Sequence, residues 1–340
     1  MPQIEIEERL GSIVGASESM RKLYRQVEQA GPSAASVLIV GETGTGKELV
    51  ARALHQRSAR KSRAYVAVNC AAMPEGLVES ELFGHEKGAF TGASTRTVGY
   101  FEQANRGTLF LDEISAMPMS QQPKLLRALQ EGTVRRLGSG SEMTVDTRVI
   151  AAMNVAPEKA MEEGRLRCDL FYRLSVFTIE VPPLRERPGD ALLLARHFAS
   201  ELAKAQDRRP LRIDPEVSRA LAGYPWPGNV RELRNAIERG VILAKDRLTL
   251  DDLPAALSRT SLAIEGHENP AAPTAPAVEV EVEVPGMTVE EVKRRLIVRT
   301  LEATGSISEA ARKLGISSRT IYNKIREWNL SPESFSSGRV

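Results

Sequence analysis

A glycine-rich segment with the sequence GETGTGKE, at residues 41–48, constrains the fold more than any other part of this chain. It follows the apolar run 37–40 and precedes a helical pattern at 49–54. A strand, a glycine-rich turn and a helix in this order predict a phosphate-binding loop, because backbone N–H groups can converge on one anion at a helix N-terminus. Lys47 would reach the outer phosphates as a point charge. The expected nucleotide-binding residues here are Gly41, Glu42, Thr43, Gly44, Thr45, Gly46, Lys47 and Glu48.

Glu48 departs from the usual pattern of such loops, which have Ser or Thr at this position. The hydroxyl ligand for Mg²⁺ is therefore missing, and another group or water must complete the shell of the ion. An ordinary Gly/Thr turn is the alternative interpretation. The spacing of Gly41, Gly46 and Lys47 between a strand and a helix favours the phosphate-binding loop.

Two carboxylates end the apolar run of residues 107–113, which reads GTLFLDE. Paired acids at the carboxyl end of a buried strand lie where α/β sheets bind their ligands. We expect Asp112 to hold Mg²⁺, directly or through water, and Glu113 to polarise the attacking water. The alternative is a solvated strand end, which the upstream phosphate-binding loop disfavours. Asn154 follows another apolar run and could sense the γ-phosphate.

The segment 81–93 has helical flanks that are interrupted by Gly88 and Gly92. Phe90 and Thr91 are therefore expected at the tip of a loop. A large exposed aromatic side chain between glycines favours contact with a partner. The alternative, that Phe90 packs under its own loop, stays open.

Arg165, Arg167 and Arg173 cluster around residues 168–172. Arginines outside their own nucleotide pocket can act as fingers on the γ-phosphate of a neighbouring subunit. A solvated basic helix face is the alternative.

The second half of the chain changes character three times. Residues 190–257 have helical periodicity, with Asp190 and Asn229 as expected helix caps, and predict a small helical lid. Residues 258–287 are rich in Pro and in alternating Val and Glu, and read as an extended linker. Residues 288–329 contain two short helical patterns separated by a Leu-Gly-Ile turn, which is typical of a helix-turn-helix.

Nine Lys and Arg residues against five Glu give the segment 288–329 a net charge of +4 (9 − 5), as expected for contact with DNA. A plain helical hairpin is the alternative. The side chains expected to face DNA are Ser318, Arg319, Thr320, Tyr322, Asn323 and Lys324.

The bulk composition limits the remaining choices. A chain of 340 residues suggests two or three domains, and 42% hydrophobic with 26% charged residues is typical of a globular protein. Cys70 and Cys168 have no metal-ligand spacing, and neither a signal peptide nor an apolar run of membrane length is present. We therefore expect a cytoplasmic protein without a membrane partner.

These motifs together resemble the bacterial enhancer-binding proteins, the AAA+ activators of sigma-54 RNA polymerase. The most diagnostic stretch is the loop by which that family engages sigma-54, which is here Gly88, Ala89, Phe90, Thr91, Gly92 and Ala93. The surrounding residues 81–86 match as well, and GETGTGKE is the family's usual form of the phosphate-binding loop. The resemblance implies an α/β fold, an AAA+ P-loop parallel sheet flanked by helices, with a small helical lid and a C-terminal all-helical Fis-type helix-turn-helix domain.

The resemblance covers nearly the whole chain and implies its boundaries. They are 1–12 for a short N-terminal extension, 13–189 for the AAA+ α/β subdomain, 190–257 for the lid, 258–287 for a flexible linker, 288–329 for the DNA-binding domain and 330–340 for a tail.

The resemblance also assigns roles to single residues. Asn69 would be the switch that holds Glu113 until the nucleotide state changes. Asn154 would be sensor I, although Met153 replaces the usual Thr before it, which puts hydroxyl-based sensing in doubt. Arg167 and Arg173 would be the trans arginine fingers, Arg231 would be sensor II, and Ile13 and Val14 would belong to the nucleotide site. Residues 136–140 would form a second loop that supports the first.

The expected protein is an ATPase ring, a hexamer, that uses ATP and Mg²⁺. It would bind enhancer DNA and remodel the closed complex of the sigma-54 RNA polymerase holoenzyme into an open one. The chain begins almost at the AAA+ module, so either a separate regulatory protein controls it in trans or the sequence is truncated. A DNA-translocating motor and a nucleotide-gated repressor are the alternatives, and the intact GAFTGA stretch disfavours both.

Overall fold

The computed structural model describes residues 9–209, 211–244, 246–257 and 289–304, together with residues 306, 310, 311, 314, 320, 321, 324 and 328. The chain divides into two compact units, Met1–His267 and Glu268–Val340, each of which is described by itself.

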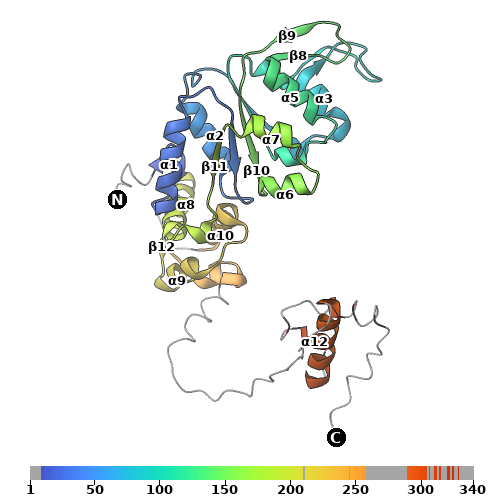
Figure 1. Cartoon of the computed structure of the whole chain (residues 1–340). Coiled ribbons are helices and arrows are strands. Elements are labelled where there is room, and N and C mark those ends of the chain that lie inside the picture. The colour runs from blue at the N-terminus through green and yellow to red at the C-terminus, as the bar shows by residue number, and fades with distance from the viewer. Residues whose placement is uncertain are drawn as a thin grey trace. The chain divides into compact units, whose positions relative to one another are not determined.

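A five-stranded parallel sheet lies at the centre of the first unit (Figure 1). Its order is β11–β3–β10–β7–β4. The strands are β3 Val37–Val40, β4 Tyr65–Asn69, β7 Thr108–Asp112, β10 Arg148–Met153 and β11 Phe177–Glu180. Because all five are parallel, their carboxyl ends meet at one edge. Asn69 and Asp112 are the last residues of their strands there, and the phosphate-binding loop and Asn154 follow theirs.

Helices cover both faces of this sheet. The side chains of a strand alternate between faces, and Leu38 packs in a different core from its neighbours Val37 and Ile39. One core contains α1 Glu18–Ala30 and α2 Lys47–Gln56, and Figure 1 shows both helices on the same side of the sheet. The other contains α3 Val78–Phe83, α4 Tyr100–Gln103, α5 Gln122–Glu131, α6 Pro157–Glu162 and α7 Cys168–Leu174. Burial on both faces explains why the sequence of the central strands is continuously apolar.

Three short antiparallel hairpins are attached to this core. The first joins β1 Arg9–Leu10 to β2 Ile13–Val14. The others are β5 Gly84–His85 with β6 Thr97–Val98, and β8 Thr133–Arg135 with β9 Glu142–Thr144. The last two lie side by side, because Leu137 N donates to Gly84 O at 2.9 Å and Glu86 N donates to Leu137 O at 3.0 Å.

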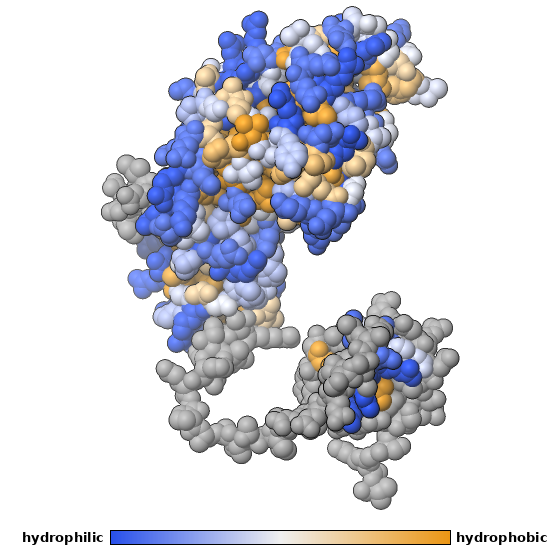
Figure 2. Space-filling model, viewed as in Figure 1, coloured by the Kyte–Doolittle hydropathy of each residue, from blue (hydrophilic) through white to orange (hydrophobic). Residues whose placement is uncertain are grey.

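The lid is a helical cluster with its own core. It comprises α8 Asp190–Ala205, α9 Pro215–Gly223 and α10 Asn229–Leu243, with the two-residue strands β12 Arg212–Ile213 and β13 Arg247–Leu248 in parallel. Trp226 is buried in this core, and its Nε1 donates to Leu221 O at 3.0 Å. Hydrophilic side chains cover most of the visible face of the first unit, with small apolar clusters between them (Figure 2).

The second unit contains α12 Val289–Thr304. Ile297 and Leu301 are buried on this helix together with Ala310, Ala311 and Ile321, and the ring of Trp328 packs against them. None of the helices in the described ranges is long and apolar enough to span a membrane.

Candidate nucleotide-binding site

The phosphate-binding loop connects β3 to α2 and has the backbone that its glycines allow. Gly44 and Gly46 have φ values of +82° and +101°, a region that L side chains rarely occupy. Lys47 begins α2, and its Nζ donates to Gly41 O at 2.7 Å and Glu42 O at 3.2 Å. Burial lowers the pKa of Lys47, while the nearby Glu113 and Asp112 act in the opposite direction. The ammonium group therefore lies between the loop and the acidic strand end.

The two expected catalytic acids stand at the end of β7. Asp112 pairs in register with Asn69 of β4, and its Oδ1 accepts from Glu113 N at 3.0 Å. Glu113 has a left-handed backbone, with φ of 55°. Burial raises the pKa of Glu113, and the positive charge of Lys47 partly counters this. A carboxylate with a raised pKa is a better proton acceptor, which suits a group that activates water.

Asn69 and Asn154 lie next to this site but have different hydrogen-bond partners. Asn69 Oδ1 accepts from Ala71 N at 2.9 Å, so the side chain caps the turn after β4. Asn154 Nδ2 lies 3.5 Å from Thr43 Oγ1 in the phosphate-binding loop. Met153 is fully buried within β10 and packs in the core, so it adds no polar group to the site.

Two expected helix caps are wrong. Asp190 is the first residue of α8 after Gly189, and its carboxylate accepts from Ala16 N, Ser17 N and Ser17 Oγ at 2.8 to 3.1 Å. Asn229 is the first residue of α10, with φ of 53°, and its side chain reaches the phosphate-binding loop. Both side chains bind distant segments because tertiary packing offers better partners than the helix ends do.

The lid closes over the loop at the start of α10. Arg231 N donates to Gly44 O at 3.2 Å. The positive charge of Arg231 is close enough to lower the pKa values of both Lys47 and Glu113. Arg231, the residue expected as sensor II, thus lies beside the phosphate-binding loop.

A cavity of about 240 Å³ adjoins the loop at Thr45 and Gly46. Ile13 and Val14 line it, as does a lid surface that the sequence analysis did not identify, formed by Leu194, His197, Phe198 and Val230. Apolar walls that open onto a phosphate-binding loop suit a nucleotide base. Only the helical periodicity of α8, which carries Leu194, His197 and Phe198, and of α10, which carries Val230, could have indicated these lid residues.

The two expected arginine fingers point to groups other than the loop of their own chain. Arg167 donates to Asp169 through Nε at 3.0 Å and Nη2 at 2.7 Å. Arg173 donates to Leu129 O at 3.1 and 2.6 Å. The structure therefore does not bring Arg167 and Arg173 together with Lys47 and Glu113.

The GAFTGA segment forms a compact loop between β5 and β6. Gly88 N donates to Ala93 O at 2.8 Å, and Ala93 N donates to Phe90 O at 3.0 Å. Phe90 is 38% exposed, with its ring centroid 5.0 Å from that of His85, so it is partly packed and partly available. Thr91 is exposed at the tip.

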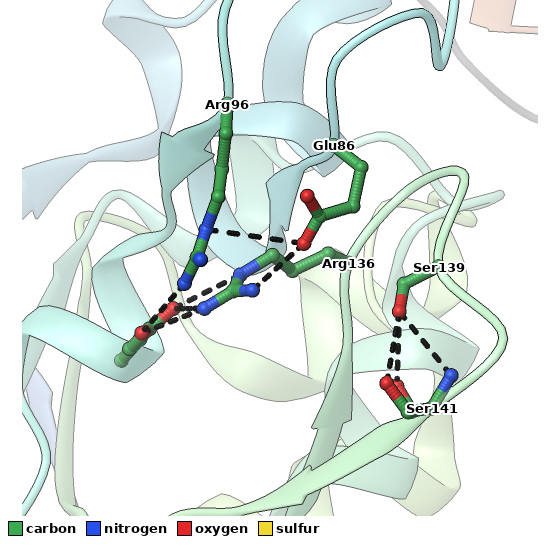
Figure 3. Close-up of polar contacts among 6 residues, drawn as sticks. Glu86, Arg96, Arg136, Ser139 and Ser141 are labelled. Atoms are coloured by element: carbon green, nitrogen blue, oxygen red, sulfur yellow. Dashed lines mark hydrogen bonds and ion pairs between the residues drawn. The ribbon is translucent and has the colours of Figure 1, made fainter.

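Arg136 fastens the base of this loop (Figure 3). Arg136, which follows β8, is mostly buried; it donates to Glu86 Oε1 at 2.8 Å and to both carboxylate oxygens of Glu102 at 2.6 to 3.1 Å. Arg96 lies within 4.0 Å of the same two carboxylates. Arg136 lies in the expected supporting loop of residues 136–140, whereas Glu102, which lies on α4, was not predicted from the sequence.

Most of the predicted DNA-contacting residues lie outside the described residues, namely Ser318, Arg319, Tyr322 and Asn323. Thr320 is exposed, and Lys324 Nζ lies 5.5 Å from the ring centroid of Trp328.

Comparison with known families divides the chain into three parts. Residues 13–180 match the sigma-54 interaction domain, residues 185–269 match an AAA+ ATPase lid domain, and residues 288–328 match the Fis family of bacterial regulatory proteins.

Similar curated proteins include larger regulators. The formate hydrogenlyase transcriptional activator FhlA of Escherichia coli is 45% identical over 94% of this chain, which spans 45% of its length. The chain thus spans about half the length of such relatives. It covers 68% of both ZraR of Klebsiella oxytoca, at 46% identity, and AtoC of Escherichia coli, at 44% identity.

Solved structures of NtrX from Brucella abortus, in complex with ADP and with ATP, are also similar. The TM-scores are 0.68 and 0.67, with 32% identity, and each match covers 94% of this chain and 70% of the other. The parallel sheet and helical lid are therefore those of an AAA+ P-loop ATPase. With its three matching domains in order, the chain belongs to the family of sigma-54-dependent transcriptional activators.

Proposed function

We propose that this chain hydrolyses ATP in a ring of identical subunits and uses the cycle to remodel sigma-54 polymerase from the closed to the open promoter complex. NtrX, a relative with the same fold, was solved with ATP and with ADP, which supports ATP as the nucleotide here. One observation carries the proposal: the nucleotide site and the GAFTGA loop are joined within one domain. Glu102 of α4 binds Arg136. The chain then continues from α4 into β7, which ends at Asp112.

The hydrolytic residues have separable tasks. Lys47 would hold the outer phosphates, and Glu113 would orient the attacking water and accept its proton. The described residues contain no cluster of three or more metal-ligating side chains. This fits Mg²⁺, which commonly binds through one or two carboxylates together with substrate phosphates and water. Asp112 would hold the ion, and the ion would neutralise developing phosphate charge.

Arg167 and Arg173 would act on the nucleotide of the next subunit. To reach that nucleotide, Arg167 would break its contact with Asp169, and Arg173 would break its contact with Leu129 O. Hydrolysis in one subunit would then depend on its neighbour in the ring, which we expect to be a hexamer. The nucleotide state would change the contacts of Asn69 and Glu113 and shift the loop of residues 88–93 against sigma-54. The Fis-type unit would bind enhancer DNA through the residues around Thr320 and Lys324.

The test compares wild type with Glu113→Gln on supercoiled sigma-54 promoter DNA. The activator hypothesis expects ATP-dependent open complexes from wild type and loss of both hydrolysis and opening in the variant. Full regulation by Glu113→Gln would instead favour a nucleotide-gated repressor. Hydrolysis that rises steeply on DNA alone, with no promoter opening, would favour a DNA motor.

A further inference from the structure

The lid holds the side chain of Glu42, the second residue of the phosphate-binding loop. Arg185 lies in the turn before α8 and donates to both carboxylate oxygens, through Nη1 at 2.8 Å and Nη2 at 2.6 Å. Asn229 Nδ2 donates to Glu42 Oε2 at 3.1 Å. Hydrogen bonding to Arg185 lowers the pKa of Glu42 to about 2, so the carboxylate is charged at neutral pH.

The lid also holds the backbone of the next three residues. Asn229 Nδ2 donates to Thr43 O at 3.1 Å, Arg231 N donates to Gly44 O at 3.2 Å, and Arg187 Nη2 donates to Thr45 O at 3.2 Å. In a trans peptide, the N–H points away from the preceding C=O. Fixing these three carbonyls toward the lid therefore turns the N–H groups of residues 44–46 to the opposite side. Thr45 N makes only a long 3.4 Å contact with Glu42 O.

Asn229 is the centre of this arrangement. It is fully buried, and its Oδ1 accepts from Leu184 N at 2.8 Å, so both ends of its amide are used. Its left-handed backbone, with φ of 53°, is one that Asn tolerates better than most residues. A strained backbone conformation of this kind persists only where the surrounding contacts hold it in place.

We propose that Glu42, Arg185 and Asn229 clamp the lid to the phosphate-binding loop and hold its peptide groups in the orientation that receives nucleotide phosphates. Arg185 and Asn229 are then positioning residues, which act through the loop rather than by touching the nucleotide. The inference deepens the proposed function and rests on its nucleotide-binding step. Lid movement and phosphate binding become one coupled event.

The direction in which one substitution changes the affinity for ATP distinguishes this clamp from a simple electrostatic effect. Glu42→Gln removes a negative charge near the expected phosphates, so charge alone predicts tighter ATP binding. The clamp predicts weaker binding, because the amide NH₂ of Gln would face the donors of Arg185 or Asn229. Arg185→Met should weaken ATP binding whether the clamp or charge alone operates. The double variant of Arg185→Met and Glu42→Gln therefore supplies the second test.

The experiment measures the dissociation constant of N-methylanthraniloyl-ATP, together with KM, kcat and Tm, for wild type, Glu42→Gln, Arg185→Met and the double variant. We expect each single variant to raise the dissociation constant and KM about three- to tenfold, the range for a partly exposed pair that positions other groups. The double variant should be no worse than either single one, because the pair acts as a unit. The kcat of Arg185→Met at saturating ATP should change less than about twofold.

Arg127→Met is the matched control, since Arg127 makes two exposed ion pairs, with Glu131 at 2.8 Å and Glu142 at 3.0 Å, away from the loop. Unchanged or tighter binding by Glu42→Gln, or effects that multiply in the double variant, would overturn the clamp. So would an equal loss in Arg127→Met, or a Tm that falls below the assay temperature in each clamp variant. Absence of binding by wild type would overturn the nucleotide-binding proposal as well, which separates the two failures.

Discussion

Arg136 and Glu102 form an ion pair of 2.6 to 3.1 Å that ties the β8–β9 hairpin to helix α4. The same guanidinium reaches Glu86 at the base of the GAFTGA loop, so one side chain joins both loops to the segment that leads into β7. Bidentate charge-assisted hydrogen bonds are directional, and this one is partly shielded from water, since the side chains of Arg136 and Glu102 are 13% and 23% exposed. We therefore expect these contacts to transmit a change in β7 to the two loops.

Arg136→Met should loosen the GAFTGA loop while leaving the nucleotide site intact. We expect amide hydrogen exchange in residues 86–96 to become at least about tenfold faster, because two carboxylates lose their shared partner. Arg135→Met is the control, since Arg135 is exposed and donates to Ser139 O at the hairpin tip. Equal exchange rates in Arg136→Met and wild type would contradict a fastening role.

Glu113→Gln should reduce ATP hydrolysis by at least about a hundredfold while ATP still binds, because a positioned proton acceptor is lost. Burial raises the pKa of Glu113 above its ordinary value of 4.5. The acid limb of the wild-type rate profile should therefore lie above that value, since the base must be deprotonated. Phosphate release measured against pH gives this limb.

The thermal stability of Glu113→Gln provides a separate check on the raised pKa of Glu113. A carboxyl whose folded-state pKa is raised costs stability once it is charged, so the variant should unfold at a higher temperature than wild type at neutral pH. The difference should fade as pH falls below the ordinary value, where both side chains are neutral. A variant that is less stable at neutral pH would contradict the assigned burial.

Gly44→Ala should abolish most nucleotide binding. Its φ is +82°, and an added Cβ would stand 2.4 Å from Gly228 O, so the loop and lid would be forced apart. Gly164→Ala is a matched control with φ of +66° and no neighbour within 4 Å of the new atom. We expect the control to lose about 1 kcal/mol of stability from backbone strain alone and to keep its affinity. Similar affinities for the two variants, measured by fluorescent nucleotide titration, would show that lid contact is irrelevant.

The sequence predicted the main parts of the site because they are local. A glycine-rich turn after a strand, and two acids, Asp112 and Glu113, that end an apolar run, follow from periodicity and spacing alone. The partners of Glu42 could not be predicted, since Arg185 and Asn229 are 143 and 187 residues away and only tertiary packing brings them together. Asp190 and Asn229 failed as caps for the same reason.

Mixed rings test the trans fingers. Arg173→Ala alone and Glu113→Gln alone should each hydrolyse ATP at least about a hundredfold more slowly than wild type. A mixture should recover part of the rate, because some interfaces combine an intact Glu113 with an intact Arg173. A steady-state phosphate assay across mixing ratios measures the recovery. No recovery at any ratio would mean that Arg173 acts within its own subunit or has no catalytic part.

Coupling of hydrolysis to polymerase through the GAFTGA loop can be measured as open-complex formation on supercoiled promoter DNA with sigma-54 polymerase. ATPase activity is followed alongside for wild type, Thr91→Ala and the control Thr95→Ala. We expect Thr91→Ala to hydrolyse ATP at a rate close to wild type but to form few open complexes, whereas Thr95→Ala hydrolyses ATP and opens the promoter as wild type does. Normal promoter opening by Thr91→Ala would contradict this coupling.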